Sequence, residues 1–316
     1  MKAAVVNSFD VPPSFEDYRE PEPKDGETVL TVEAAALSPI VKRLAAGEHY
    51  SSTATAGFVP GVDGVGIDAN GQRVYFLFPK APFGSMAERS LAATSMTVPV
   101  PDPLASDQAA AIVTAALASW VALTRRAKLL RNETVLVLGA TGASGSMAIQ
   151  TARFLGARKI VAVGRNAGKL ERLDADVKIS LENGTADAAL SDQFDGGINI
   201  VLDFVWGEPA NRVLRAATQQ RGSPMGEPTL RYVQLGTMAG DGISIRGDML
   251  RSSGLLLMGS GIGSVAVADL LAGAGELLAA APEAKFHTDF QSLPLRMVED
   301  AWRGDADTRY VLLPGR

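Results

Sequence analysis

Three regularly spaced glycines are the residues of this chain best suited to bind a ligand through the backbone. Gly139, Gly142 and Gly145 follow four apolar residues at 135–138 and precede an alanine-rich, helix-like segment. A strand-to-helix turn needs glycine where the chain bends, where a phosphate approaches, and where the helix packs on the sheet. Amide groups at the helix start then meet the phosphate charge. The predicted contacts to a dinucleotide pyrophosphate are Thr141, Gly142, Ala143, Ser144 and Gly145.

The end of the next predicted strand indicates which dinucleotide binds. Sites for NAD place an acidic residue about 20 residues beyond the glycines, where it holds the ribose 2′-hydroxyl. This chain has Gly164, Arg165 and Asn166 there, with no acid among them. The planar guanidinium of Arg165 suits a 2′-phosphate, and Lys169 adds a second positive charge. The sequence therefore predicts NADP(H) as the cofactor.

The elements that position these residues are of two kinds. Short apolar runs broken by turn residues predict a β-rich region over the first hundred residues. Ser106 is predicted to cap the alanine-rich helix that follows. Strands then alternate with helices, which favours a parallel sheet with right-handed crossovers. The predicted strands of this second part lie at 135–138, 160–163, 198–204, 232–235 and 255–258, the helices at 146–155 and 166–173, and a last strand at 309–313.

The composition is that of a soluble globular protein of about two domains. The 316 residues are 47% hydrophobic and 21% charged, with a net charge of −5. An acidic chain lacks the basic surface of a nucleic-acid-binding protein. The chain also lacks a secretory signal and an apolar run of the roughly 18 residues that a membrane-spanning helix needs. We expect a cytoplasmic protein that binds neither nucleic acid nor membrane.

The count of metal-binding side chains argues against metal chemistry. The chain has no cysteine, which excludes disulfides, thiolate nucleophiles and cysteine-ligated zinc. It has two histidines, His49 and His287, far apart in the sequence. We therefore expect no metal site.

An ordered series of motifs runs along the whole chain. The main ones are PGVDGVG at 60–66, GQRVYF at 71–76, GSMAER at 84–89, the glycine turn within 135–157, VLDFVWG at 201–207, VQLGTMAG at 233–240, LLLMGSGIGS at 255–264 and RYVLLP at 309–314. This set resembles the medium-chain dehydrogenase/reductase superfamily, in its zinc-independent quinone-reductase-like branch.

The resemblance implies an α/β protein of two domains. A GroES-like, β-rich domain would comprise 1–115 and 264–316, and a Rossmann domain with a doubly wound parallel sheet would comprise 116–263. Family members commonly dimerise through the edge of the nucleotide sheet, so 255–258 would form the interface of a homodimer. Further cofactor contacts implied at strand ends and at the long helix are Thr114, Gly236, Thr237, Ser260 and Gly261.

The departures from the family concern the catalytic groups. Zinc-dependent relatives carry a Cys and a His where this chain has Ser38 and Val62. Many quinone-reductase relatives carry an Asn and an Asp where this chain has Ser38 and Val41. A mechanism that relies on those groups is therefore not available here.

The chemistry that remains is hydride transfer from NADPH to a small, already electrophilic acceptor, a quinone or an α,β-unsaturated carbonyl. Such a reaction needs the two reactants held face to face and water excluded. The candidate catalytic residues are Ser38 as a hydrogen-bond donor, Lys42 as an orienting group and Tyr50 as a proton donor. Ser38 is equally suited to cap the following helix, because it precedes a proline.

Two other interpretations stay open. An enoyl-thioester reductase would need a basic groove for a phosphorylated carrier, and Arg125, Arg126 and Lys128 are clustered in the sequence. A non-catalytic NADPH-binding sensor could use the same fold, because fold does not fix function.

Overall fold

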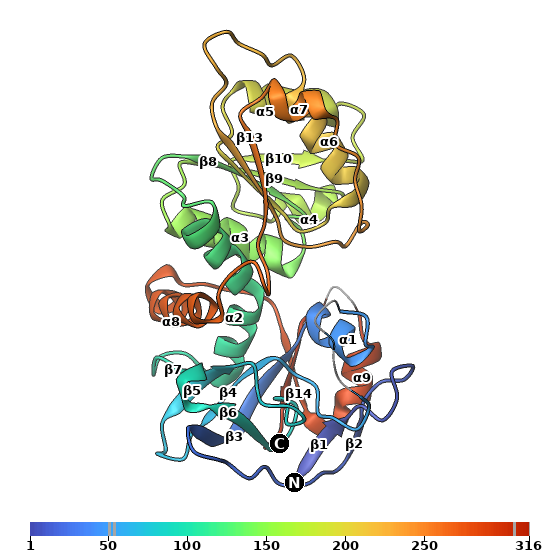
Figure 1. Cartoon of the computed structure of the whole chain (residues 1–316), viewed down its shortest axis with the longest axis vertical. Helices are drawn as coiled ribbons and strands as arrows, with labels where there is room; N and C mark the ends of the chain where they lie inside the picture. The colour runs from blue at the N-terminus through green and yellow to red at the C-terminus, as the bar shows by residue number, and fades with distance from the viewer. Residues whose placement is uncertain (50–51, 53–54, 306–307, 316) are drawn as a thin grey trace. The chain divides into compact units, whose positions relative to one another are not determined.

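The computed structural model describes residues 1–49, 52, 55–305 and 308–315. The chain forms two compact units (Figure 1). The first unit comprises Met1–Ala115 and Leu270–Arg316, and the second comprises Ala116–Asp269. Both ends of the chain therefore belong to the first unit.

The second unit contains a six-stranded parallel sheet in the order β10-β9-β8-β11-β12-β13. Its strands are β8 Thr134–Leu138, β9 Lys159–Gly164, β10 Val177–Ser180, β11 Ile200–Asp203, β12 Leu230–Gln234 and β13 Leu255–Gly259. The chain runs outward from β8 to β10, returns to β11 beside β8, and runs outward again to β13. The strand order reverses between β8 and β11, where sheets of this kind bind nucleotides.

Helices separate these strands along the chain (Figure 1). They are α3 Ala143–Phe154, α4 Ala167–Glu171, α5 Ala186–Asp195, α6 Gly207–Thr218 and α7 Gly247–Arg251. Strands β8 and β9 contribute side chains to two buried apolar clusters, one of which also contains residues of α5 and α6, while the other contains residues of α3. The predicted doubly wound α/β sheet is confirmed.

The sequence patterns missed some elements of this unit. Strand β10 is only four residues long and half-buried at the sheet edge, so it lacks the apolar run of a central strand. Helix α6 begins with Gly-Glu-Pro, which resembles a turn, although proline is tolerated in a first helical turn. Helix α3 begins at Ala143, three residues before the predicted start.

The first unit is built mainly of antiparallel strands. A seven-stranded sheet has the order β14-β15-β3-β4-β5-β7, with β6 also paired to β3, and β1 and β2 form a separate ribbon. The strands are β1 Lys2–Val5, β2 Ser14–Asp17, β3 Glu27–Leu37, β4 Asp63–Ile67, β5 Arg73–Leu77, β6 Arg89–Ala93, β7 Thr97–Pro99, β14 Gln291–Pro294 and β15 Tyr310–Leu313. Two short helices, α1 Pro39–Ala45 and α9 Val298–Arg303, complete it. The predicted β-rich region is confirmed.

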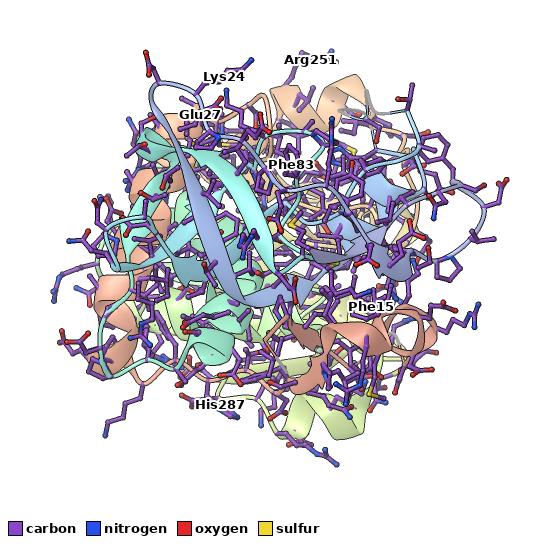
Figure 2. The ribbon with its side chains drawn as sticks, turned by 90° about the horizontal axis from the view of Figure 1, so that it is seen from below. Phe15, Lys24, Glu27, Phe83, Arg251 and His287 are labelled. Atoms are coloured by element: carbon purple, nitrogen blue, oxygen red, sulfur yellow. The ribbon has the colours of Figure 1, made fainter. Side chains whose placement is uncertain are left out.

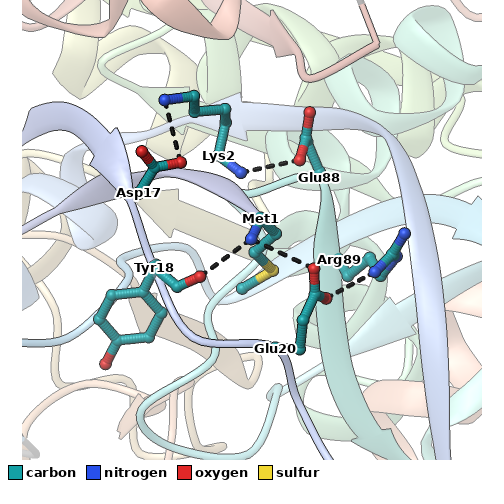
Figure 3. Close-up of polar contacts among 7 residues, drawn as sticks. All are labelled: Met1, Lys2, Asp17, Tyr18, Glu20, Glu88 and Arg89. Carbon is teal, nitrogen blue, oxygen red and sulfur yellow. Dashed lines mark hydrogen bonds and ion pairs between the residues drawn. The ribbon is translucent and has the colours of Figure 1, made fainter.

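Polar contacts attach the β1–β2 ribbon to β6 (Figure 3). The amino group of Met1 donates to the Tyr18 carbonyl at 2.9 Å and lies 3.1 Å from Glu20. Arg89 on β6 binds the other oxygen of Glu20 at 2.6 Å. The backbone amide of Lys2 donates to Glu88 at 2.7 Å. These contacts fix the ribbon beside the sheet that carries α1.

Two long helices contain the boundaries between the units. Helix α2, Ser106–Val121, continues as a π-helical turn at Ala122–Arg126, and α8 spans Val267–Ala284. Within the described residues, Ser106–Arg126 is the one helix long and apolar enough to span a membrane, and 67% of its apolar window is buried. It is therefore a core helix of a soluble fold. Ser106, which was predicted to cap this helix, is its first residue. Its hydroxyl donates to Glu33 at 2.5 Å.

Candidate functional site

The glycine turn after β8 is held in shape by its own backbone. Gly139 has φ +87°, a conformation that favours glycine. A Cβ on Gly145 would lie 2.2 Å from the carbonyl oxygen of Gly139, so no side chain fits there. These two glycines let α3 begin directly against the end of β8, as the sequence predicts.

Gly142 differs from its two neighbours in the motif. Its φ is −80°, and a Cβ there would meet only the Gly139 carbonyl oxygen, at 3.6 Å. The fold itself therefore tolerates a side chain at this exposed position. The first amide groups of α3 have no partner within the helix. A phosphate needs amide groups that it can approach without meeting a side chain. These residues therefore fit the pyrophosphate of a dinucleotide.

Arg165 lies at the carboxyl end of β9, the strand next to β8. Its guanidinium is exposed and makes no hydrogen bond or ion pair with any described residue. Its backbone is fixed, because the Ser180 hydroxyl donates to the Arg165 carbonyl at 2.7 Å. The Asn166 side chain caps α4 by accepting the amide of Lys169 at 2.9 Å. The available cation beside the turn fits the 2′-phosphate of NADP(H).

The ends of β12 and β13 carry the other predicted cofactor contacts of this unit. A Cβ on Gly236 would lie 2.5 Å from the Phe204 carbonyl oxygen, so the turn after β12 requires glycine. Ser260 donates its amide to the Gln234 carbonyl at 3.0 Å, which joins the ends of the two strands. Thr237 and Gly261 therefore follow strands whose carboxyl ends lie at one edge of the sheet.

A pocket of about 330 Å³ opens at this edge of the sheet. Asp203, at the end of β11, holds the backbone that leads into this pocket: its Oδ1 accepts the amides of Val205 and Trp206, both at 2.9 Å. Its Oδ2 accepts the hydroxyl of Tyr232 at 2.7 Å. Burial raises the pKa of Asp203, and these three donors oppose the rise. No partner for Asp203 could be assigned from the sequence, because its carboxylate bonds combine the turn that follows it with a residue of the neighbouring strand β12. The pocket is lined by Trp206, Gln234, Thr237, Asp241, Leu257, Met258 and Gly259.

Ser38 occupies the N-cap position of α1 in the first unit. Its φ of −119° and ψ of 163° suit a cap, but its side chain makes no capping hydrogen bond. The residue is 4% exposed, and its hydroxyl has no hydrogen-bond partner among the described residues. The expected capping bond is therefore absent. A buried hydroxyl without a partner is costly, so its presence favours a role with a ligand.

Lys42 lies one helical turn after Ser38. Its ammonium donates to the Trp302 carbonyl at 2.7 Å, and burial lowers the pKa of Lys42. The residue lines a small cavity of about 210 Å³ together with Phe9 and Val11. One of its three N–H groups is used in this contact, which leaves two for water or a ligand. Tyr50, the third predicted catalytic residue, lies outside the described residues.

Thr114 on α2 faces a buried carboxyl group of the first unit. Its hydroxyl lies 2.9 Å from Asp63 Oδ2 and 2.7 Å from the Ala110 carbonyl. Because the hydroxyl carries one hydrogen, it donates to one of these two oxygens at a time. Tyr75 donates to the same Oδ2 at 2.9 Å. Burial raises the pKa of Asp63, and hydrogen bonds from Tyr75 and Thr114 and the charge of buried Arg309 oppose it. Sequence reasoning missed this cluster, since its members come from distant segments.

The comparison with known proteins assigns the chain to a family. No protein-family model matches the chain. A probable NADPH-dependent quinone reductase of Emericella nidulans is 30% identical to it over 99% of this chain and 100% of that protein. The chain belongs to the medium-chain dehydrogenase/reductase superfamily. Within it, the chain falls in the quinone-oxidoreductase branch, as the motifs predicted.

Solved structures of this branch have the same fold. The quinone oxidoreductase of Thermus thermophilus, solved alone and with NADPH, superposes with a TM-score of 0.82 at 26% identity, over 99% of this chain and 100% of that one. Human quinone oxidoreductase is 30% identical over a shorter stretch, 58% of this chain and 56% of that protein. The GroES-like and Rossmann architecture expected for the family is therefore confirmed.

Two observations on this quinone-oxidoreductase relative concern the possibilities of a metal site and of a groove for a phosphorylated carrier. The part of the chain that the structure describes contains no group of three or more His, Cys, Asp or Glu side chains placed to hold a metal ion. Arg125 pairs with Asp269 at 3.8 Å, and Arg126 donates to the Gly259 carbonyl at 2.9 Å. These two arginines bind the protein itself, which does not favour a groove for a phosphorylated carrier. His287, to which the sequence gives no role, is exposed (Figure 2). It lies 3.2 Å from Asp289.

Proposed function

We propose that this protein is an NADPH-dependent reductase of quinones or α,β-unsaturated carbonyls. The observation that carries the proposal is the bare turn at Gly142, with the available guanidinium of Arg165 at the end of the adjacent strand. The full-length similarity to a probable NADPH-dependent quinone reductase supports it. The bound cofactor would supply a hydride, which with one proton converts a quinone to a hydroquinone and leaves NADP⁺.

The protein's own residues would bind, orient and exclude water. The amides at the start of α3 hold the pyrophosphate, and Arg165 with Lys169 holds the 2′-phosphate. The nicotinamide half would contact the strand ends of the second unit, with Thr114 of α2 as a further contact. The proposed cofactor-binding residues are Thr114, Thr141, Gly142, Ala143, Ser144, Gly145, Arg165, Lys169, Gly236, Thr237, Ser260 and Gly261.

The acceptor's oxygen would be met by side chains of the first unit. We propose Ser38 as the donor to that oxygen, because its buried hydroxyl has no partner among the described residues. Lys42, with two N–H groups left, would orient acceptor or water. Tyr50 would donate a proton to the reduced product. These three roles are proposals that substitution can test singly.

The decisive experiment compares the two cofactors on two arginine variants. Native protein, Arg165→Ala and Arg172→Ala are titrated with NADPH and with NADH, and oxidation of each cofactor is followed with 1,4-naphthoquinone. Arg172 is an exposed arginine at the end of α4, and its substitution controls for the loss of a surface charge. Loss of charge-assisted bonds to a phosphate should weaken NADPH binding in Arg165→Ala by about 10- to 100-fold.

The other outcomes are equally clear. Equal affinity of the native protein for NADPH and NADH would contradict the role of Arg165. Tight NADPH binding without turnover across a panel of quinones and enones would instead identify a sensor. Turnover that depends on a coenzyme A or carrier-protein thioester would identify an enoyl-thioester reductase.

We also propose a homodimer formed through β13. This strand is the edge of the sheet, and its Leu256 is 52% exposed. An apolar edge strand with unpaired backbone groups invites pairing with a second copy. Light scattering of Leu256→Lys should give the mass of a monomer where the native protein gives that of a dimer. A cytoplasmic location stays a proposal as well, to be tested by fractionation of the source cells.

A further inference from the structure

The turn between β11 and α6 contains a backbone conformation that its sequence does not suit. Trp206 has φ +57° and ψ −155°, a region occupied almost only by glycine. The next residue, Gly207, also has a positive φ, of +60°. A Cβ on Gly207 would lie 2.3 Å from the Ala239 carbonyl oxygen, so glycine is required there. Position 206, by contrast, carries tryptophan, the largest of the side chains.

The surrounding residues hold this conformation in place. The carboxylate of Asp203 accepts the amides of both Val205 and Trp206. The Val205 carbonyl accepts the amide of Ala239 at 2.7 Å, which ties the turn to the loop after β12. A strained residue that its neighbours hold so firmly is typical of a functional site.

The indole of Trp206 is half-buried and forms one wall of the 330 Å³ pocket. Its ring meets that of Tyr232 at 67°, with centroids 6.3 Å apart, an edge-to-face contact that fixes its orientation. Tyr232 is itself held by its bond to Asp203. The pocket volume lies within the range of about 300–1,000 Å³ that is usual for small-molecule sites.

The other lining residues indicate what kind of molecule would fit. Leu257 and Met258 make the wall apolar, while Gln234 and Asp241 supply polar groups. The carboxylate of Asp241 disfavours a phosphate or any other anion. Thr237, which we place beside the nicotinamide ribose, lines the same pocket. A flat, uncharged aromatic molecule is the ligand that matches an indole wall with apolar neighbours.

We propose that Trp206 is a specificity-determining residue, against which a flat, uncharged aromatic acceptor such as a two-ring quinone packs. The inference rests on the proposed function and narrows its substrate class. The strained backbone at 206 persists because it directs the indole into this pocket. Anionic quinones and small acyclic enones would gain less from the same wall.

The test uses Trp206→Gly and Trp206→Phe. Glycine suits the backbone conformation, and the strain that it relieves offsets part of the packing lost with the indole, so Trp206→Gly should remain folded at the assay temperature. The ratio of kcat/KM for 1,4-naphthoquinone to that for but-3-en-2-one should fall about tenfold in Trp206→Gly, mainly through KM. Trp206→Phe should restore most of the ratio, and native protein should favour 1,4-naphthoquinone over its 2-sulfonate.

The outcomes separate this inference from the proposed function. An unchanged ratio, or equal losses for both acceptors, would overturn the role of Trp206. Weaker NADPH binding in Trp206→Gly would assign the indole to the cofactor and also overturn it. If the native protein reduces no acceptor, the proposed function fails. In that case, calorimetry of 1,4-naphthoquinone binding tests the role of Trp206 separately. Equal affinity in the native protein and in Trp206→Gly would overturn that role.

Discussion

The glycine turn of the second unit and helix α1 of the first unit are built on different principles. The turn presents backbone amides: its shape depends on the absence of side chains at Gly139 and Gly145, and Gly142 leaves the amides open. Helix α1 presents side chains, Ser38 and Lys42, whose value depends on what surrounds them. The turn binds through backbone groups, so its chemistry depends little on which side chains surround it. In α1, by contrast, a substitution can change the chemistry while the fold stays the same.

The largest expected effect separates two glycines within the turn. Gly145→Ala would force a Cβ to 2.2 Å from the Gly139 carbonyl oxygen, and should destabilise the second unit by about 3 kcal/mol, as strong overpacking does. Gly142→Ala has room, so it should cost less than about 1 kcal/mol and weaken NADPH binding. Urea unfolding and NADPH titration of both variants measure the difference. Equal stability losses would show that Gly142 also serves the fold.

The next prediction concerns the buried carboxyl of the first unit. Tyr75→Phe removes a donor to Asp63 and should cost about 1–3 kcal/mol at pH 7. Burial raises the pKa of Asp63 in the folded protein above its usual 3.8, and the Tyr75 hydrogen bond opposes that rise. The stability contribution of this group is thus present below pH 3.8 and is lost as pH rises through the folded pKa.

Removing the Tyr75 hydroxyl raises that pKa further, so the variant loses most at the higher pH. Denaturant unfolding of native protein and Tyr75→Phe at pH 7 and pH 4.5 should show the smaller difference at pH 4.5. A difference that grows as pH falls would contradict this assignment of the carboxyl.

Ser38→Ala tests the side-chain site directly. Because the hydroxyl is buried without a partner among the described residues, removing it should change stability by less than about 1 kcal/mol, or increase it. The same change should slow acceptor reduction by about tenfold, the value of one lost hydrogen bond near 1.4 kcal/mol. Steady-state kinetics with thermal melting give both numbers. A stability loss without a rate loss would return Ser38 to a purely structural role.

The smallest effect is expected for Lys42→Met. Its bond to the Trp302 carbonyl should be worth about 1 kcal/mol of stability. Because part of its donor capacity is spent on that carbonyl, the loss in kcat/KM should be smaller than for Ser38→Ala. A larger loss would make Lys42 the main group that meets the acceptor.

Local rules explain which parts could be predicted from sequence. The strands β8, β9 and β11 contain short apolar runs, and the glycine turn follows from steric limits within a few residues. The family motifs extend this to the whole chain. These signals predict the fold class, which is confirmed, and the cofactor-binding residues, which stay a prediction.

What escaped prediction depends on contacts between distant segments. The sequence around Trp206 does not indicate a positive φ, because its turn is also held by the loop at Ala239, far along the chain. The Asp63 cluster draws on strand β5 and helix α2. Ser38 sits where a cap is expected, and only its surroundings reveal that its hydroxyl makes no capping bond.

The order of strands in the first unit also has a consequence for synthesis. Its sheet pairs β3 with β15, Leu37 with Tyr310, so two segments nearly the whole chain apart must meet. The second unit is one continuous segment and can fold as soon as it leaves the ribosome. The first unit must wait, with the edge of β3 open, until residues 310–313 have been made. During that interval the emerging chain is most exposed to aggregation and has most need of chaperones.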